Sequence, residues 1–173
     1  MNKTMKISLA VLLLGLMFFS TVSFAILNSV SALTIDSVTI ADEILNMPEH
    51  KDIKIALLDF HGETTSERIA MGWHLDGRIS AAWGTHTHVQ TNDARILPEG
   101  TGYITDIGMC GDRNGVIGVK RETILNNFLH PEHTRAHDFA EDGEVILSGI
   151  VVDVDDAGQC TSIETLNIIS KIR

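Results

Sequence analysis

Residues 53–60, IKIALLDF, form an apolar run of strand length whose end carries an acid, Asp59. Such a run is typical of an interior strand that is buried on both faces of a parallel sheet. Just downstream, Thr64 and Glu67 have the spacing of a capping box, which predicts a helix that begins near residue 65. The order strand, loop, helix indicates an α/β unit whose open edge lies at the end of the strand.

A second apolar run, ISAAWG at residues 79–84, predicts the next buried strand. The polar sequence THTH follows it directly at residues 85–88. Because ligands of open α/β sheets gather at the carboxyl ends of the strands, this position favours a binding site at the same edge.

Further elements follow from shorter patterns. Residues 41–47 predict a short amphipathic helix, and residues 120–130 predict another. Two β-rich runs at 144–156 and 162–170 predict a C-terminal hairpin. The segment that joins them matches several positions of a calcium-binding loop, but the fifth position is Ala157 and strands flank it. The hairpin is therefore the preferred interpretation.

The amino-terminal segment has a different character. Residues 7–27 contain no charged side chain, and they follow a basic start that carries Lys3 and Lys6. A charged start, an apolar stretch and the small-x-small triplet at 23–25 are typical of a cleaved signal peptide. An uncharged stretch of this length can also span a bilayer, and residues 8–19 alone fit a buried strand.

We accordingly expect three regions. Residues 1–25 are interpreted as a signal peptide or membrane anchor that forms an apolar helix, residues 26–40 as a connector, and residues 41–173 as the folded part. A total of 173 residues suits one ordinary domain. A working targeting segment would place the protein outside the cytoplasm or on the membrane.

The charge of the chain limits its partners. Thirteen basic and 23 acidic residues give a formal net charge of −10. Affinity for a phosphate backbone rests on clustered Lys and Arg, so a nucleic-acid-binding face is not expected. A small anionic substrate would need local positive charge, which a bound metal ion can supply. Cys110 and Cys160 are interpreted as two thiols in preference to a lone disulfide.

Three histidines follow the two predicted strands. His61 comes after the first, and His86 and His88 come after the second. In extended backbone, residues two apart point to the same face about 6.6 Å apart, so this pair can serve one metal ion or two neighbouring ions. The spacing alone fits polar strand-end residues equally well. A separate group at 130–137 is interpreted as part of a solvated loop.

Several sequence blocks, taken together, resemble a known family. They are DFHGETTSE (59–67), DGR (76–78), GTHTHVQTND (84–93), ILPEGTGYITDIGM (96–109) and RETI (121–124). In this order they resemble the C-terminal half of calcineurin-like metallophosphoesterases, specifically the YmdB-like branch of phosphodiesterases acting on cyclic nucleotides. The resemblance covers residues 36–171. It implies an α/β fold, half of an α/β–β/α sandwich, and a cytoplasmic location where no targeting segment precedes it.

The resemblance also implies roles for particular residues. It makes His61 and His86 ligands of one metal ion and places His88 on a second. The implied metals are Fe, Mn or Zn, which neutral imidazoles hold well. The neighbouring polar residues are then candidates for orienting the imidazoles from behind; these are Asp59, Glu63, Thr85 and Thr87.

The chain departs from the family in its first part. The family's first half brings an aspartate, a Glu-Asn pair and an Asn-His pair, whereas residues 1–35 contain no Asp, Glu or His. Only LLGLMFF (13–19) resembles a strand of that half. The intact site of the family holds two metal ions. We therefore expect this chain to bind at most one.

Two hypotheses follow. The chain is half of a phosphodiesterase for small phosphodiesters, inactive alone and completed by a complementary N-terminal half or by a homo-oligomer. Alternatively, it is a non-catalytic truncated or exported domain that binds at most one metal ion through three histidines.

Overall fold

A parallel sheet forms the centre of the computed structural model, which describes residues 7–11, 24–27 and 35–172. The strand order is β2-β3-β4-β6-β5, and all neighbours are parallel except β5 and β6. The bounds are β2 Phe24–Leu27, β3 Ile55–His61, β4 Ala81–Thr85, β5 Arg95–Ile96 and β6 Gly102–Ile104. β3 and β4 are the two buried strands that the apolar runs predict.

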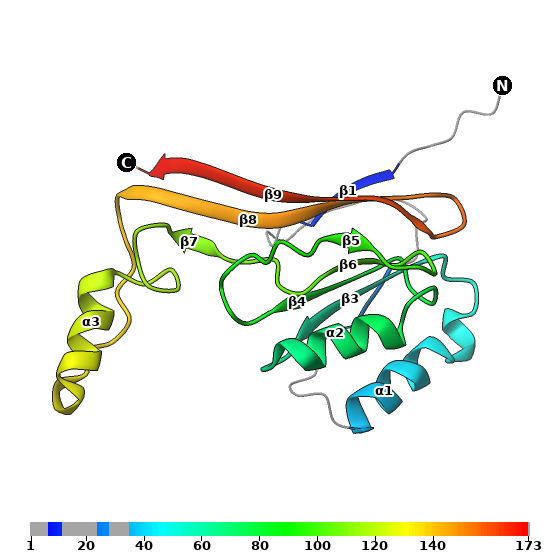
Figure 1. Cartoon of the computed structure of the whole chain (residues 1–173), viewed down its shortest axis with the longest axis horizontal. Coiled ribbons are helices and arrows are strands. Elements are labelled where there is room, and N and C mark those ends of the chain that lie inside the picture. Colours follow the sequence, from blue (N-terminus) through cyan, green and yellow to red (C-terminus); the bar gives the residue numbers. More distant parts are fainter. Residues whose placement is uncertain (1–6, 12–23, 28–34, 173) are drawn as a thin grey trace.

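A second sheet lies against one face of the first (Figure 1). It is antiparallel, and β8 pairs with β1, β7 and β9. The bounds are β1 Ile7–Val11, β7 Cys110–Asp112, β8 Gly143–Val154 and β9 Cys160–Ile172. β8 and β9 confirm the predicted hairpin. The Asp155 carboxylate accepts from the amides of Ala157 and Gln159, both at 2.9 Å, so it stabilises the turn.

Helices cover the other face of the parallel sheet, as Figure 1 shows. They are α1 (Ile35–Leu45) and α2 (Thr65–His74). Alternate residues of β3 serve the two layers: Leu58 and Phe60 pack under the helices, whereas Ile55 and Leu57 pack against β8. Because every β3 side chain up to Leu58 is buried, the run reads as continuously apolar.

The predicted capping box of α2 is present. The Thr64 hydroxyl accepts from the amide of Glu67, and the Glu67 carboxylate accepts from the amide of Thr64. This reciprocal pair satisfies two amides that the first turn would otherwise leave unbonded. It also fixes the path of the loop between β3 and α2, which begins at the end of the strand.

The amino-terminal expectations need correction. The apolar helix expected over residues 1–25 is not confirmed, because residues 7–11 and 24–27 are strands that pair with β8 and β3. Sheet edges that offer unpaired backbone groups accept an apolar run as a strand. The signal-peptide core and LLGLMFF (13–19) lie outside the described residues. Within the described ranges, no helix is both long and apolar enough to cross a membrane.

The connector expected up to residue 40 is also shorter than predicted, since α1 begins at Ile35. Its Ser and Thr content suggested a linker. The spacing of Val38, Ala41 and Leu45 instead places apolar side chains on one helical face, which packs on the parallel sheet.

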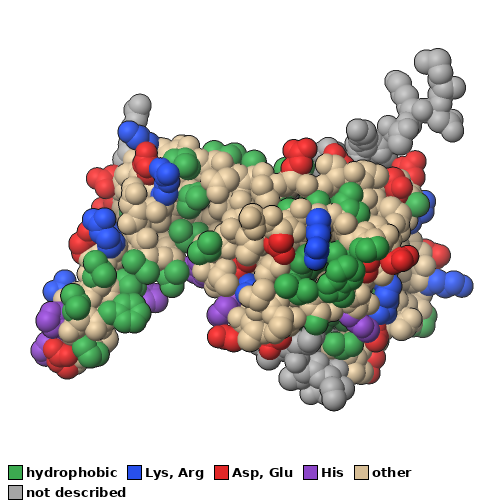
Figure 2. Space-filling model, in the orientation of Figure 1, with side chains coloured by type: hydrophobic (Ala, Val, Ile, Leu, Met, Phe, Trp, Pro, Cys, Tyr) green, Lys and Arg blue, Asp and Glu red, His purple; other side chains and the backbone are tan. Residues whose placement is uncertain are grey.

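The third helix, α3 (Arg121–Leu129), lies outside the sandwich beyond the end of β7 (Figure 1). Two short 3₁₀ turns, η1 (Pro48–His50) and η2 (Pro131–His133), complete the described elements. Hydrophobic side chains gather over α3 in Figure 2. The α3 surface consists of five exposed apolar side chains on and beside this helix: Ile117, Leu125, Phe128, Leu129 and Phe139.

Candidate metal-binding site

The histidine site lies where β3 and β4 end side by side. His61 is the last residue of β3, and its register partner on β4 is Thr85. The β4 chain then continues into His86, Thr87 and His88. The parallel pairing of the two strands brings His61 and His86 together, although 25 positions separate them in the sequence.

A continuous chain of polar contacts runs through this edge. The Thr85 hydroxyl donates to Asp59 Oδ1 at 3.3 Å, and His61 Nδ1 lies 3.1 Å from the same hydroxyl oxygen. His61 Nε2 lies 3.2 Å from His86 Nδ1, and His86 Nε2 lies 3.3 Å from Glu63 Oε2. Five of the seven candidate site residues predicted from the sequence are therefore connected by polar contacts.

The order of donors fixes the proton on His61. Since Thr85 gives its hydroxyl proton to Asp59, its oxygen accepts from the Nδ1–H of His61. The neutral imidazole then has its lone pair on Nε2, the atom that faces His86. A polar group behind a histidine that fixes the tautomer in this way is the usual arrangement around metal ligands.

The spacing of the two imidazoles tests their fit to a metal ion. Two nitrogens bound to one tetrahedral zinc ion lie about 3.3–3.4 Å apart, given Zn–N bonds of about 2.0–2.1 Å. His61 Nε2 and His86 Nδ1 are 3.2 Å apart, and their rings meet edge to face with centroids 5.0 Å apart. This pair therefore fits two positions of a metal site.

His88 lies in the same cavity but does not join the contact. Its Nδ1 lies 3.0 Å from the carbonyl oxygen of Ile117 and donates to it, so Nε2 carries the lone pair. An open cavity of about 460 Å³ is lined by His61, His86 and His88 together with apolar residues. Within the described part of the chain, no three His, Cys, Asp or Glu side chains converge as a complete metal-holding group. The assignment of three ligands stays a prediction.

Backbone strain concentrates at this cavity. Three non-glycine residues of the described chain have a positive φ: His86 at 140°, His88 at 62° and Ile117 at 49°. All three line the cavity. Such conformations cost on the order of 1–3 kcal/mol each and cluster at functional sites, where the surrounding structure holds them.

Thr87 contacts a buried carboxylate rather than an imidazole ring. Its hydroxyl and its amide both donate to Asp106, at 2.8 and 2.9 Å. Asp106 is fully buried and pairs with buried Arg68. Sequence reasoning missed both residues, since Arg68 stands in an ordinary helical pattern and Asp106 follows a short strand. A charged residue inside the apolar run GYITDIG is the signal that could have indicated a buried carboxylate.

Asp59 differs from its neighbours in its surroundings. Burial at the end of β3 raises the pKa of this carboxyl, and the hydrogen bond from Thr85 opposes that rise. The carboxylate is half-buried and lies behind His61, to which the Thr85 hydroxyl links it. Such a group is suited to orienting His61 through Thr85.

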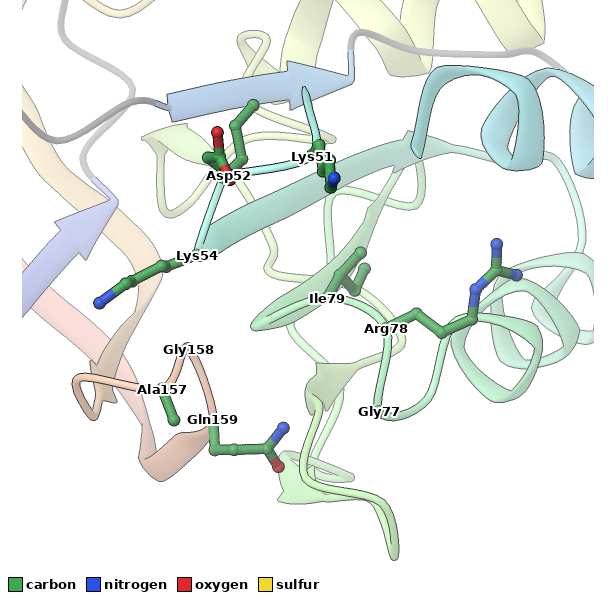
Figure 3. Close-up of a pocket in the computed structure, with 10 residues that line it drawn as sticks. Lys51, Asp52, Lys54, Gly77, Arg78, Ile79, Ala157, Gly158 and Gln159 are labelled. Atoms are coloured by element: carbon green, nitrogen blue, oxygen red, sulfur yellow. The ribbon is translucent and has the colours of Figure 1, made fainter. Parts of the chain in front are cut away.

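A second cavity lies at the opposite edge of the parallel sheet, before β3 and β4 begin (Figure 3). Its volume is about 480 Å³, slightly larger than the histidine cavity, and Lys51 and Lys54 line it. Arg78 also belongs to its lining but turns away from Gln159 in Figure 3, and its guanidinium pairs with Asp42 at 2.6 Å. Size alone would favour this cavity, but it contains no histidine and lies away from the carboxyl ends of the strands.

Comparison with known proteins decides the family. A model of the YmdB-like protein family matches residues 15–166, which is most of the chain. The chain belongs to the YmdB-like family. A relative from Bacillus subtilis (strain 168), a 2′,3′-cyclic-nucleotide 2′-phosphodiesterase, is 49% identical over 116 residues, covering 67% of this chain and 43% of its own. The resemblance to the YmdB-like branch of metallophosphoesterases is confirmed.

Two solved structures share the fold of this YmdB-like chain. A hypothetical protein from Thermus thermophilus has a TM-score of 0.73 at 32% identity, covering 85% of this chain and 57% of its own. A novel phosphatase from Mycoplasma pneumoniae has a TM-score of 0.72 at 26% identity, covering 95% and 58%. The chain thus spans roughly half the length of these relatives. The predicted mixed α/β class is confirmed.

Proposed function

We propose that this chain contributes the histidine side of a metal-dependent phosphodiesterase site. The observation that carries the proposal is the 3.2 Å separation of His61 Nε2 and His86 Nδ1, with Thr85 and Asp59 holding the His61 tautomer. Fe, Mn or Zn suits this donor set, because imidazole nitrogens bind all three. A bound divalent ion would supply the positive charge that draws electron density from a phosphoryl oxygen.

The residues of the chain have separate tasks in this proposal. His61 and His86 hold the ion, while Glu63 accepts from the outer nitrogen of His86 and keeps its ring in place. His88 faces the same cavity from the other side, with its Nε2 free of the contact to Ile117. In this proposal His88 binds a second ion or a phosphoryl oxygen. Thr85 and Asp59 orient His61.

The cavity suggests the class of substrate. Besides the histidines, its lining includes apolar side chains from the segment between β6 and β7, from β8 and from the segment after α3, namely Ile107, Met109, Leu147 and Phe139. A small phosphodiester with an apolar or aromatic part would place its phosphate at the imidazoles and that part against this wall. A cyclic nucleotide has this composition, and the Bacillus subtilis relative is a cyclic-nucleotide phosphodiesterase.

The remaining ligands are proposed to come from another polypeptide. Two imidazoles in contact leave a four-coordinate ion short of partners, and residues 1–35 offer no Asp, Glu or His. A complementary half or a second copy could supply carboxylates at the cavity. The α3 surface borders this cavity through Ile117 and Phe139, and its exposed apolar side chains favour contact with such a partner.

Metal binding is the first test. We expect Zn²⁺ to bind the purified chain with about one ion, and His61→Ala and His86→Ala each to weaken binding at least tenfold. His137→Ala is the matched control, because His137 is exposed and does not line the cavity. Equal affinity in the His86→Ala variant and the parent protein would contradict the proposed site.

Hydrolysis separates the two hypotheses. The chain is incubated with Mn²⁺ or Fe²⁺ and bis(p-nitrophenyl) phosphate, alone and after mixing with the first half of the Bacillus subtilis relative. Turnover that appears on mixing and falls on the order of 100-fold in His86→Ala supports the half-site. Metal binding without turnover in either condition favours the non-catalytic domain.

A further inference from the structure

A buried ion pair lies beneath the loop that carries His86 and His88. Arg68, on α2, has 2% of its side chain exposed, and Asp106, just after β6, has none exposed. Arg68 Nη1 donates to Asp106 Oδ2 at 2.6 Å. Removing two charges from water is costly, and a buried pair is often no more stabilising than apolar residues of similar size. Stability alone therefore explains this pair poorly.

The contacts of Asp106 point to the histidine loop. Its Oδ2 atom also accepts from the amide and the hydroxyl of Thr87, and Oδ1 accepts from the amide of Gly108 at 2.9 Å. Four donors thus converge on one carboxylate. Two of the four come from the single residue between His86 and His88.

Both neighbours of Thr87 have a positive φ, at which a non-glycine residue does not rest unaided. The two bonds from Asp106 fix the peptide between them. His86 is thereby turned toward His61, and His88 toward the opposite wall of the cavity, where it donates to Ile117. Without the carboxylate, the loop would relax to ordinary backbone angles and the two imidazoles would leave these directions.

Arg68 connects this loop to the one after β3. Its Nε donates to the carbonyl oxygen of Thr64, and Thr64 follows Glu63, the partner of His86. Gly84 leaves room for this path, because a Cβ there would lie 2.5 Å from Arg68 Cδ. One guanidinium therefore braces both loops that hold the His86 ring.

We propose that Arg68 and Asp106 are positioning residues for the metal-binding histidines. Neither touches the ion; together they hold Thr87 so that His86 and His88 face one cavity. The inference rests on the proposed function in one respect, namely that the histidines bind a metal ion. It adds to that site a pair of residues that hold the histidine loop in position. Neither the sequence blocks nor the spacing of the ligands indicates this pair.

The first test measures Co²⁺ affinity by visible absorption, well below the unfolding temperature of every variant. We expect Asp106→Asn to weaken binding at least tenfold. Thr87→Val removes only the side-chain hydroxyl that donates to Asp106, and it should weaken Co²⁺ binding several-fold. Thr87→Ser keeps both the hydroxyl and the amide as donors, and it should bind Co²⁺ like the parent protein. The stability control is Asp76→Asn, because Asp76 braces Glu99 and Thr101 in a loop that does not line the cavity.

The second test needs no metal. Hydrogen exchange of the peptide spanning 84–90 should accelerate at least tenfold in Asp106→Asn and stay within twofold in Asp76→Asn. Unchanged exchange in Asp106→Asn would overturn the positioning role, as would an Asp76→Asn loss of Co²⁺ affinity that matches the Asp106→Asn loss. If the parent protein binds no Co²⁺ while the exchange result holds, the proposed function fails and the brace stands.

Discussion

Removing the hydroxyl of Thr85 tests the tautomer argument directly. Thr85→Val keeps the shape of the side chain and its place in β4 but takes away both the acceptor of His61 Nδ1–H and the donor to Asp59. His61 is then free to carry its proton on Nε2, the nitrogen that should bind the metal. We expect weaker metal binding with the fold unchanged.

The size of the loss follows from the two contacts. Groups that orient a ligand histidine contribute between tenfold and 100-fold to metal affinity. The bonds at Thr85 are long, 3.1 and 3.3 Å, and His61 is exposed, so water can replace part of the contact. We therefore expect the lower limit, about tenfold in Kd, or about 1.4 kcal/mol.

Competition with a chromophoric chelator measures Zn²⁺ affinity in this range. Thr85→Ser restores the hydroxyl and should bind within about twofold of the parent protein, and circular dichroism should show the same fold for both variants. If Thr85→Val binds as tightly as Thr85→Ser, the hydroxyl does not set the His61 tautomer, and the argument for Nε2 as the ligand atom is refuted.

Three further outcomes are expected. Gly72→Ala should lower the free energy of unfolding in urea by about 1 kcal/mol, because a Cβ 2.5 Å from the buried Tyr103 ring outweighs the gain in helix propensity; a more stable variant would contradict this. Burial would raise the pKa of Asp93, but hydrogen bonds from Thr105 and Thr91 lower it overall. The ionised carboxylate therefore stabilises the fold above the ordinary Asp pKa, and this contribution is lost as pH falls through the folded-state pKa. On acidification, the free energy of unfolding should consequently fall less steeply with pH in Asp93→Asn than in the parent protein. Equal slopes in the two proteins would contradict this prediction. Phe128, 81% exposed on α3, should promote self-association, so Phe128→Ser should shift sedimentation toward monomer, whereas the control Arg135→Ser should not.

Strands and helices after residue 52 could be predicted because local patterns agree with the fold. β3 and β4 are buried on both faces, so their apolar runs are unambiguous, and the capping box marks the start of α2. The amino-terminal segment was harder. An apolar run fits a signal, an anchor or a strand equally well, and the choice depends on whether sheet edges far along the chain offer a partner.

The site was predictable in part for a related reason. Parallel strands end at one edge, so His61 and His86 could be placed together from sequence. The direction of the His88 ring, which points away from the contact between His61 and His86, could not be predicted from sequence. It depends on a positive φ and on the Ile117 carbonyl, 29 positions away. The Arg68–Asp106 pair was equally hidden, since burial of a charge is a tertiary property.

The costs in this structure gather around one cavity, and this bears on whether the histidines of that cavity bind a ligand. Two strained histidines, a buried ion pair beneath them and a carboxyl of raised pKa behind them all oppose folding. The capping box of α2 and the apolar alternation between the layers, by contrast, follow local preference. At the histidine cavity, the departures from local preference aim two imidazole nitrogens at each other. Such departures are expected at a functional site, where the geometry serves to bind a ligand. A domain without a ligand at this edge would have no physical need for them, so the arrangement favours a bound ligand at these histidines.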